Sequence, residues 1–377
     1  MAESAITPKE RAMIEKLRDA VKDDLSAFYD TDYNLLRWLQ GHNNDIDTVV
    51  HKLRCHLRFR KCWDLDNMHN RSRDDDIHSH WPDGLTGLSG KVDDAIVNVE
   101  QAGSVDYWGK MQTYSGIEVM KSRVYDLEMM LFNVMKHEKE TGRQASIIYI
   151  MDLKDLQYSA QLVSLVTGPL RCLSQFMTDH YVELTKYFVF VNMPTFFYHI
   201  YRLAQPLIPE RTRNKGRFLG PDWRREILDY SHPTALPDFW NIEGGESLFS
   251  ANLKRPVKYD VEKYCKKAIS AEHKLLSVAA GRTEFISVSV AAGAQLKWSV
   301  FTDGEFGFGV FYASDPAETD EMKLEMVYPQ FHRVATPNVT PLEDSLLCEK
   351  AGVYKFWFDN KTAWWYPVKV HHKIRVD

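Results

Sequence analysis

Few residues of the chain have types and spacings that could support covalent chemistry. Asp152 and Asp155 follow an apolar run, where α/β enzymes often place catalytic acids, but we favour capping of the next helix. His371 and His372 lie on an alternating segment, and no His or Cys spacing is typical of a zinc site. GxSxG, HExxH, Walker A and protein-kinase motifs are absent from the sequence. We therefore expect no enzymatic activity, no metal and no cofactor.

Non-covalent chemistry is indicated by an apolar segment that is followed by positive charge. The segment from about Thr195 to Ile208 has apolar side chains around much of a helix: Phe196, Phe197, Ile200, Leu203, Leu207 and Ile208. Residues 202–225 contain seven basic side chains and two acidic ones. Such a helix is usually part of a core. With excess positive charge beside it, it also suits reversible contact with an anionic membrane surface.

The elements before this segment predict an α/β sheet. Two apolar runs, Ile147–Met151 and Tyr187–Val191, are separated by a stretch with helical features. Because strands that are buried on both faces lack polar alternation, the sheet is expected to be mostly parallel. Tyr107–Lys110 is interpreted as the end of a further strand.

A small helical bundle is predicted ahead of the sheet. Thr7 and Glu10 form a capping box around a proline at the first helical position. A later helix is apolar on one face. Its other face is basic, and we interpret that face as a solvated surface: Lys52, Arg54, Arg58, Arg60 and Lys61.

The last hundred residues change to a period of two. Apolar and polar residues alternate in Ile286–Val290, Leu296–Val300, Phe306–Tyr312, Tyr354–Phe358 and Val368–Val376. Several alternating strands separated by turn residues predict an antiparallel β-sandwich.

Composition excludes several classes of protein. The chain has 377 residues and a net charge of −5, which argues against a nucleic-acid partner. Its five cysteines lack CxxC spacing, which indicates a reducing compartment. The early charges of Lys9, Glu10 and Arg11 leave no secretory hydrophobic region, and no apolar run reaches the ~18 residues of a membrane span. We expect a cytoplasmic protein.

Several motifs together resemble a known lipid-binding family. Ile150–Lys154, His180–Glu183 and Gln205–Ile208, followed by Lys215–Gly220, are similar in order to the motifs of CRAL-TRIO domains. Residues 35–39 and 53–61 resemble the family's N-terminal helical module. The β-region resembles a GOLD domain through these segments: Leu296–Trp298, Asp303-Gly304, Gly307–Gly309, Gly352–Tyr354 and Phe358–Asn360.

The resemblance implies a fold and a ligand site. It implies an α/β lipid-binding domain with a mixed, mostly parallel sheet as the floor, preceded by the helical bundle and followed by the all-β sandwich. The floor would include Ile148, Ile150, Phe188 and Phe190. The gate would be the apolar segment defined above.

The same resemblance assigns polar roles. In members that transfer phosphatidylinositol, an acid and a lysine contribute to headgroup binding, and Glu183 and Lys215 stand at the matching positions. A structural salt bridge between them is the equally weighted alternative. The motif proline of the family is Val182 here. The basic residues at the pocket entrance, expected to face the membrane, are Arg211, Arg213 and Arg217.

These inferences combine into one expectation with an alternative. The domains would span residues 1–65, 75–245 and 271–377, with a linker at 246–270. The leading hypothesis is a cytosolic lipid-transfer protein that encloses one phospholipid, such as phosphatidylinositol, or one tocopherol-like isoprenoid, and contacts an anionic membrane transiently. The alternative is a lipid-regulated adaptor whose GOLD domain binds a partner protein at Golgi or vesicle membranes. A hydrolase is disfavoured because the nucleophile elbow is missing.

Overall fold

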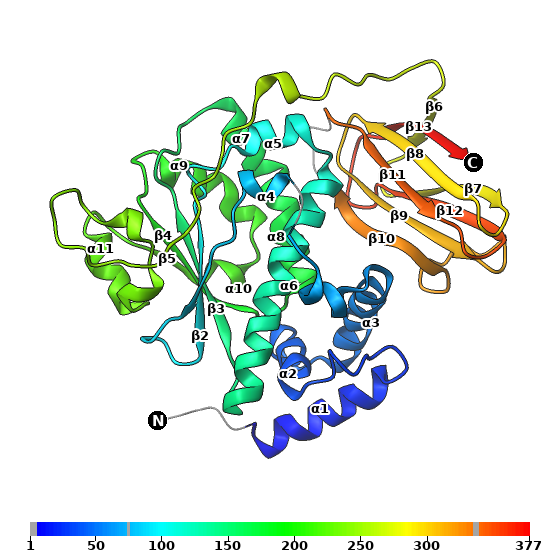
Figure 1. The fold of residues 1–377 in the computed structure, drawn as a ribbon. Coiled ribbons are helices and arrows are strands. Elements are labelled where there is room, and N and C mark those ends of the chain that lie inside the picture. Colours follow the sequence, from blue (N-terminus) through cyan, green and yellow to red (C-terminus); the bar gives the residue numbers. More distant parts are fainter. Residues whose placement is uncertain (1–5, 74–75, 335–338) are drawn as a thin grey trace.

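Three folded parts follow one another along the chain (Figure 1). The computed structural model describes residues 6–73, 76–334 and 339–377, and the predicted domain boundaries at residues 1 and 75 fall outside these ranges. A helical part is followed by an α/β part and then by a β-sandwich, which is the order that the sequence predicts.

The N-terminal part is the predicted helical bundle. It contains α1 (Pro8–Val21), α2 (Asp32–Gly41) and α3 (Ile46–Trp63). The capping box forms as expected: Glu10 N donates to Thr7 Oγ1 over 3.2 Å, and Thr7 N donates to the Glu10 carboxylate over 2.9 Å.

The central part is built on a five-stranded mixed sheet in the order β1-β2-β3-β4-β5. The strands are β1 (Leu85–Leu88), β2 (Ala95–Glu100), β3 (Ser146–Asp152), β4 (Thr185–Val191) and β5 (Gly216–Phe218). Only the β1–β2 pair of this sheet is antiparallel. The mostly parallel sheet is therefore confirmed.

Helices supply the covers of this sheet. They are α4 (Ile77–His80), α5 (Tyr107–Thr113), α6 (Gly116–Thr141), α7 (Ala160–Thr167), α8 (Pro169–His180), α9 (Phe197–Ala204), α10 (Glu210–Arg213) and α11 (Trp223–Glu226). The segment Tyr107–Lys110 is thus the start of a helix, and its prediction as a strand end is wrong. Asp106 caps this helix by accepting a hydrogen bond from Gly109 N at 2.8 Å.

The C-terminal part is an antiparallel sandwich of two four-stranded sheets, β10-β9-β12-β7 and β11-β8-β13-β6. The strands are β6 (Lys274–Val278), β7 (Thr283–Val290), β8 (Gln295–Thr302), β9 (Phe306–Ala313), β10 (Glu325–Val334), β11 (Leu342–Leu347), β12 (Gly352–Asp359) and β13 (Val368–Val376). All five alternating segments of the sequence form strands here, and inward side chains such as Phe308 and Phe356 are fully buried.

The sandwich packs against α3 and α8, and this contact uses the basic face of α3. Arg58 Nη2 donates to Glu321 O over 3.0 Å and also to Leu324 O. Phe331 of β10 meets Phe59 edge to face, with ring centroids 5.7 Å apart. Arg58 is therefore an interface residue, and Arg60 is 2% exposed and pairs with Glu128 of α6, so the prediction of a wholly solvated basic face is wrong.

A buried histidine pair lies where α3 meets the end of α8. His56 Nδ1 and His180 Nδ1 are 3.1 Å apart, and the ring of His180 stacks on Phe176 with centroids 4.5 Å apart. Burial lowers the pKa of His180 to about 3 and also lowers the pKa of His56, since a charged imidazolium would lose its hydration there.

Acidification is expected to destabilise the protein through His180. Its folded pKa of about 3 lies below the unfolded value of 6.5, so the unfolded state takes up the proton first as the pH falls. The stability that comes from the neutral His180 is fully present above its unfolded pKa of 6.5. It is lost as the pH falls from there toward the folded pKa of about 3. The free energy of unfolding should therefore fall by about 2 kcal/mol between pH 7 and pH 5 from this group. Urea denaturation at both pH values measures it.

The matched comparison is with His180→Phe, which keeps an aromatic ring but cannot titrate. This variant should lose less stability than the natural protein between the two pH values, whereas His51→Phe on an exposed site should behave as the natural protein does. Burial raises the pKa of Asp126 to about 6, so its protonation at lower pH raises the free energy of unfolding. This effect is the same in all three proteins and cancels when they are compared. Equal pH slopes for His180→Phe and the natural protein would contradict the prediction.

Candidate functional site

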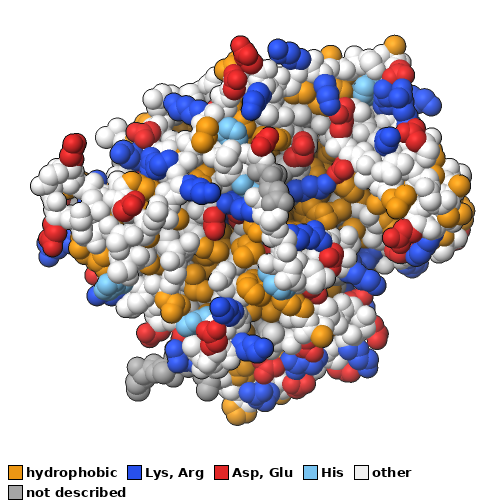
Figure 2. Space-filling view, in the orientation of Figure 1, with side chains coloured by type: hydrophobic (Ala, Val, Ile, Leu, Met, Phe, Trp, Pro, Cys, Tyr) orange, Lys and Arg blue, Asp and Glu red, His pale blue; other side chains and the backbone are white. Residues whose placement is uncertain are grey.

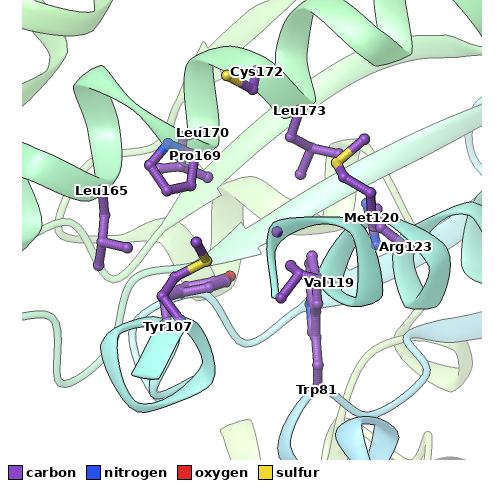
Figure 3. A pocket seen from close by; sticks show the side chains of 12 residues that line it. Trp81, Tyr107, Val119, Met120, Arg123, Leu165, Pro169, Leu170, Cys172 and Leu173 are labelled. Atoms are coloured by element: carbon purple, nitrogen blue, oxygen red, sulfur yellow. The ribbon is translucent and has the colours of Figure 1, made fainter. Parts of the chain in front are cut away.

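A small apolar cavity lies between the helices on one face of the sheet (Figure 3). It is enclosed by side chains of α5, α6, α7 and α8, and its volume is about 50 Å³. The lining residues are Trp81, Tyr107, Met111, Gly116, Val119, Met120, Arg123, Leu165, Pro169, Leu170, Cys172 and Leu173. The wall is almost entirely apolar. Such a wall suits a hydrophobic guest, but the present volume is far below the ~300 Å³ or more of typical ligand sites.

Arg123 is the charged side chain in the lining of the cavity, and it belongs to a buried polar network. Its Nη2 contacts Tyr149 Oη, and Tyr149 Oη in turn donates to the Glu100 carboxylate. Trp81 Nε1 donates to the same carboxylate over 3.1 Å, and Tyr107 Oη donates to it as well. The carboxylate therefore ties β2, β3 and α5 together around the end of the cavity.

A second buried cation lies beside this network. Lys110 of α5 is 1% exposed, and its Nζ lies 3.4 Å from the ring centroid of Trp81. Burial holds the pKa of Lys110 well below its usual range. Among the described residues, neither Lys110 Nζ nor Arg123 Nε has a hydrogen-bond partner. Both are donors that a polar ligand group could satisfy after a rearrangement of Trp81.

The apolar segment after β4 lies over the neighbouring part of this sheet face. Phe197 and Ile200 are buried, and the ring of Phe197 lies 5.5 Å from that of Phe190, centroid to centroid. On the outer side, Tyr198 is 57% exposed and Leu203 is 49% exposed. The segment thus has an apolar inner face and a partly apolar outer face, as the sequence predicts for a gate.

The gate helix is shorter than predicted. Only Phe197–Ala204 forms α9, and a 3₁₀ turn follows at Gln205–Leu207. The α-helix ends there because Pro206 lacks an N–H group that could continue the helical hydrogen bonds. Phe196 precedes the helix, and Leu207 and Ile208 lie beyond it, each half-buried.

The predicted floor residues do not share one face of the sheet. Phe188 and Phe190 face the helices α6 to α9, and Phe190 stacks on Phe218 with centroids 4.9 Å apart. Ile148 and Ile150 face the opposite side, where they pack against the segment from Leu219 to Phe249. Successive side chains of a strand alternate between faces. In β3 it is therefore Tyr149 and Met151 that point toward the helices.

Glu183 and Lys215 are brought together as expected, in an ion pair. Lys215 Nζ lies 3.0 Å from Glu183 Oε2 and also donates to Thr185 O over 2.8 Å. Arg211 Nε lies 2.5 Å from Glu183 Oε1. Two cations on one carboxylate leave a local excess of one positive charge, so the cluster suits a further anionic group as well as the structural role.

The three entrance arginines do not form one basic surface. Arg211 is engaged with Glu183, and Arg213 Nη1 donates to Gln205 O over 3.4 Å. Arg217 points to the opposite face of the sheet, where its guanidinium lies 4.6 Å from the ring centroid of Tyr187. Arg217 therefore lies on the sheet face opposite α9, and the membrane-facing role of the three arginines stays a prediction.

Asp152 is buried and does not cap the next helix, α7, whose N-cap is Ser159, so the capping prediction for Asp152 is wrong. Its Oδ2 accepts a hydrogen bond from Trp240 Nε1 at 2.8 Å, and its Oδ1 accepts one from Asn192 Nδ2 at 2.7 Å. Across the part of the chain that the structure describes, no cluster of three or more His, Cys, Asp or Glu residues could hold a metal ion.

Sequence reasoning missed the polar network around Arg123 and Lys110. The only signal was the placement of Tyr107, Lys110 and Met111 at helical spacing, and this segment was interpreted as a strand. None of the helices formed by residues 6–73, 76–334 and 339–377 combines the length and hydrophobicity that a bilayer crossing requires.

Three family models match successive parts of the chain. Residues 98–241 match the CRAL/TRIO domain, residues 263–377 match the F28H7_8_C-like C-terminal domain, and residues 6–68 match a domain of unknown function, DUF8435. The GOLD assignment for the sandwich is not confirmed, since the model that matches there is a different one.

Two relatives align with nearly the whole chain, and two further proteins align with about half of it. The CRAL-TRIO domain-containing protein F28H7.8 of Caenorhabditis elegans is 27% identical over 97% of this chain and 92% of that protein. Protein ctg-1 of the same organism is 22% identical over 99% and 98%. The Sec14 cytosolic factor of Schizosaccharomyces pombe is 24% identical over 55% and 72%. The crystal structure of Sfh5 covers 56% of this chain and 81% of its own, with a TM-score of 0.47 and 14% identity.

Proposed function

We propose that the protein binds one hydrophobic lipid between its central sheet and helices α5 to α9, and carries it between membranes, because residues 98–241 match the CRAL/TRIO domain. The observation that supports this most is the apolar cavity between α5, α6, α7 and α8. It lies on the sheet face that α9 covers, so a guest held there would be shielded from water.

Lipid uptake requires the cavity to expand. A volume of about 50 Å³ accommodates no acyl chain, so α7, α8 or α9 must move away from the sheet. α9 is suited to this movement because it is short, ends at Pro206 and already exposes apolar side chains. Tyr158, 63% exposed, extends that outer surface, and its ring meets Phe196 edge to face at 5.6 Å between centroids. We propose that this surface contacts the membrane while the gate is open.

We propose that the lipid has an anionic headgroup, bound by Lys215. In Lys215→Ala, uptake of phosphatidylinositol should fall by about tenfold, since one charge-assisted hydrogen bond is lost. Uptake of a neutral isoprenoid such as tocopherol should not change. Binding of each radiolabelled lipid from vesicles measures this. Lys186→Ala, at an exposed site on β4, is the control, and unchanged phosphatidylinositol uptake in Lys215→Ala would show that Lys215 serves only the ion pair with Glu183.

Two experiments test the proposal as a whole. Native mass spectrometry of the purified chain should show one bound lipid, and incubation with vesicles should load it. A protein that stays free of lipid in both experiments would contradict lipid binding. Lipid transfer between donor and acceptor vesicles then separates a carrier from the alternative, a lipid-regulated adaptor.

The adaptor alternative is favoured by the packing of the sandwich on a wall of the cavity. Arg171 of α8 pairs with Glu305 of the sandwich, and Arg333 Nη1 lies 2.6 Å from the same carboxylate. A movement of α8 on lipid uptake would therefore displace the ion pair with Glu305 and so affect the C-terminal domain. In either case we propose a cytoplasmic protein without enzymatic turnover or cofactor, because enclosing a lipid breaks no covalent bond.

A further inference from the structure

Three consecutive aromatic side chains project from the end of the sandwich. In the connection between β12 and β13, Trp364 is 86% exposed, Trp365 is 83% exposed and Tyr366 is 80% exposed. Every other large hydrophobic side chain of the described residues is less exposed than these three. Single exposed apolar residues are common on soluble proteins, but a contiguous group of large rings marks an interaction surface.

The projection is held in place by hydrogen bonds at its base. Asn360 is 3% exposed, and its Nδ2 donates to Val278 O and to Tyr366 O, over 3.0 Å each. Asn360 N donates to Arg282 O over 2.9 Å, and Ala363 N donates to Asn360 O over 3.2 Å. Both ends of the connection are thus fixed to the sandwich, and the three rings are presented outward.

Exposed cations lie beside the rings, together with acidic side chains. Arg282, Lys361 and Lys369 are exposed on the connection or next to it, and Asp303 is the exposed acid beside Lys369. Lys361 lies at 3.7 Å from Glu321 and 3.9 Å from Asp359, which are long distances for ion pairs. Neither Arg282 nor Lys369 has an ion-pair partner among the described residues.

We propose that the Trp364–Tyr366 tip is a membrane anchor that inserts into the interface of an anionic phospholipid bilayer. Tryptophan and tyrosine suit that depth because their rings are apolar while the indole N–H and the phenol O–H can bond to headgroups and water. The three cations would lie at headgroup level, where anionic lipids attract them. A protein partner or a second copy of this chain would need a complementary groove, whereas a membrane accepts a convex tip of this kind.

This anchor is distinct from the gate surface and does not depend on lipid carriage. It would hold the C-terminal domain on a membrane whether or not α9 opens. The two proposals therefore fail separately: loss of the tip weakens binding to vesicles, while a protein that cannot bind a lipid would still bind vesicles through the tip.

Co-flotation of the full chain with phosphatidylcholine vesicles that contain phosphatidylserine tests the proposal. The triple variant Trp364→Ser, Trp365→Ser, Tyr366→Ser should bind these vesicles at least about tenfold more weakly, since apolar insertion and charge act together in such anchors. It should keep the natural melting temperature, because the rings contact little. The control is Val261→Ser, which removes a single side chain that is 67% exposed and should bind as the natural protein does.

Tryptophan fluorescence gives a second, direct measurement. Emission of the natural protein should shift to shorter wavelength on adding vesicles and should be quenched by brominated phosphatidylcholine, and Trp365→Ser alone should reduce both effects. Unchanged flotation of the triple variant, or emission that vesicles leave unshifted, would overturn the proposal. The proposal would also be overturned if the natural protein did not bind vesicles and instead self-associated through the tip in sedimentation equilibrium.

Discussion

Replacing Arg60 by methionine is expected to lower the free energy of unfolding by about 3–5 kcal/mol, which is the usual cost of leaving one partner of a buried ion pair alone. Arg60 is 2% exposed, and its two terminal nitrogens lie 2.8 and 3.0 Å from the two carboxylate oxygens of Glu128. Methionine keeps much of the volume but leaves Glu128 buried, with Tyr181 Oη as a remaining donor at 2.8 Å. Urea denaturation at neutral pH measures the loss.

Two further variants separate the ion pair from packing. In the double variant Arg60→Met, Glu128→Gln, the neutral amide can still accept from Tyr181, so a good part of the lost stability should return. Lys22→Met removes an exposed cation that pairs with Asp19 and is expected to leave the stability nearly unchanged. If the single Arg60 variant unfolds at the same urea concentration as the natural protein, the pair does not hold α3 to α6.

Hydrophobic periodicity was sufficient to predict the order and type of the three parts. Each β-sandwich strand predicted from alternation forms, because alternate side chains pack between the two sheets, although β9 and β12 are largely buried on both faces. The capping box of Thr7 and Glu10 is a local interaction, so the sequence contains all that is needed to place it. Tyr107–Lys110 was misassigned because a short apolar segment does not distinguish a strand from a helix, and the Asp106 cap decides it.

The faces of the central sheet could not be predicted in the same way. A strand buried on both sides shows no alternation, so the sequence does not say whether Ile150 or Tyr149 faces the helices. The same uncertainty placed Arg217 beside the gate, although it lies on the other face. Motif matching did bring Glu183 and Lys215 together, because each residue lies within two positions of the start of β4 or β5, which are neighbouring parallel strands.

Buried charges were the other limit of sequence reasoning. Arg60 belongs to a run of basic residues that looks solvated, and its acidic partner lies 68 positions away along the chain. Arg123 and Glu100 are likewise distant in sequence and meet only because α6 packs on the sheet. Ion pairs of this kind depend on tertiary contacts, so no local sequence pattern predicts them.

Val119→Trp is expected to reduce lipid uptake by at least about tenfold, because specific ligand sites need a preformed or expandable apolar volume. Val119 lies on α6 and points into the cavity (Figure 3), whose volume of about 50 Å³ an indole ring would take up. Figure 2 shows hydrophobic side chains gathered in the middle of the visible face. Extra bulk in a packed interior costs about 1–3 kcal/mol.

The measurement is transfer of a fluorescent phospholipid between vesicles, with the melting temperature recorded in parallel. Lys136→Trp makes the same substitution at an exposed position of α6 and should transfer lipid as the natural protein does. A folded Val119→Trp protein that still takes up lipid normally would show that the ligand avoids the space between α5, α6, α7 and α8. The ligand would then have to lie under α9 alone, against Phe190 and Phe218, where the inner face of the gate already packs. The cavity variant therefore decides which part of the helical cover must move when the lipid enters.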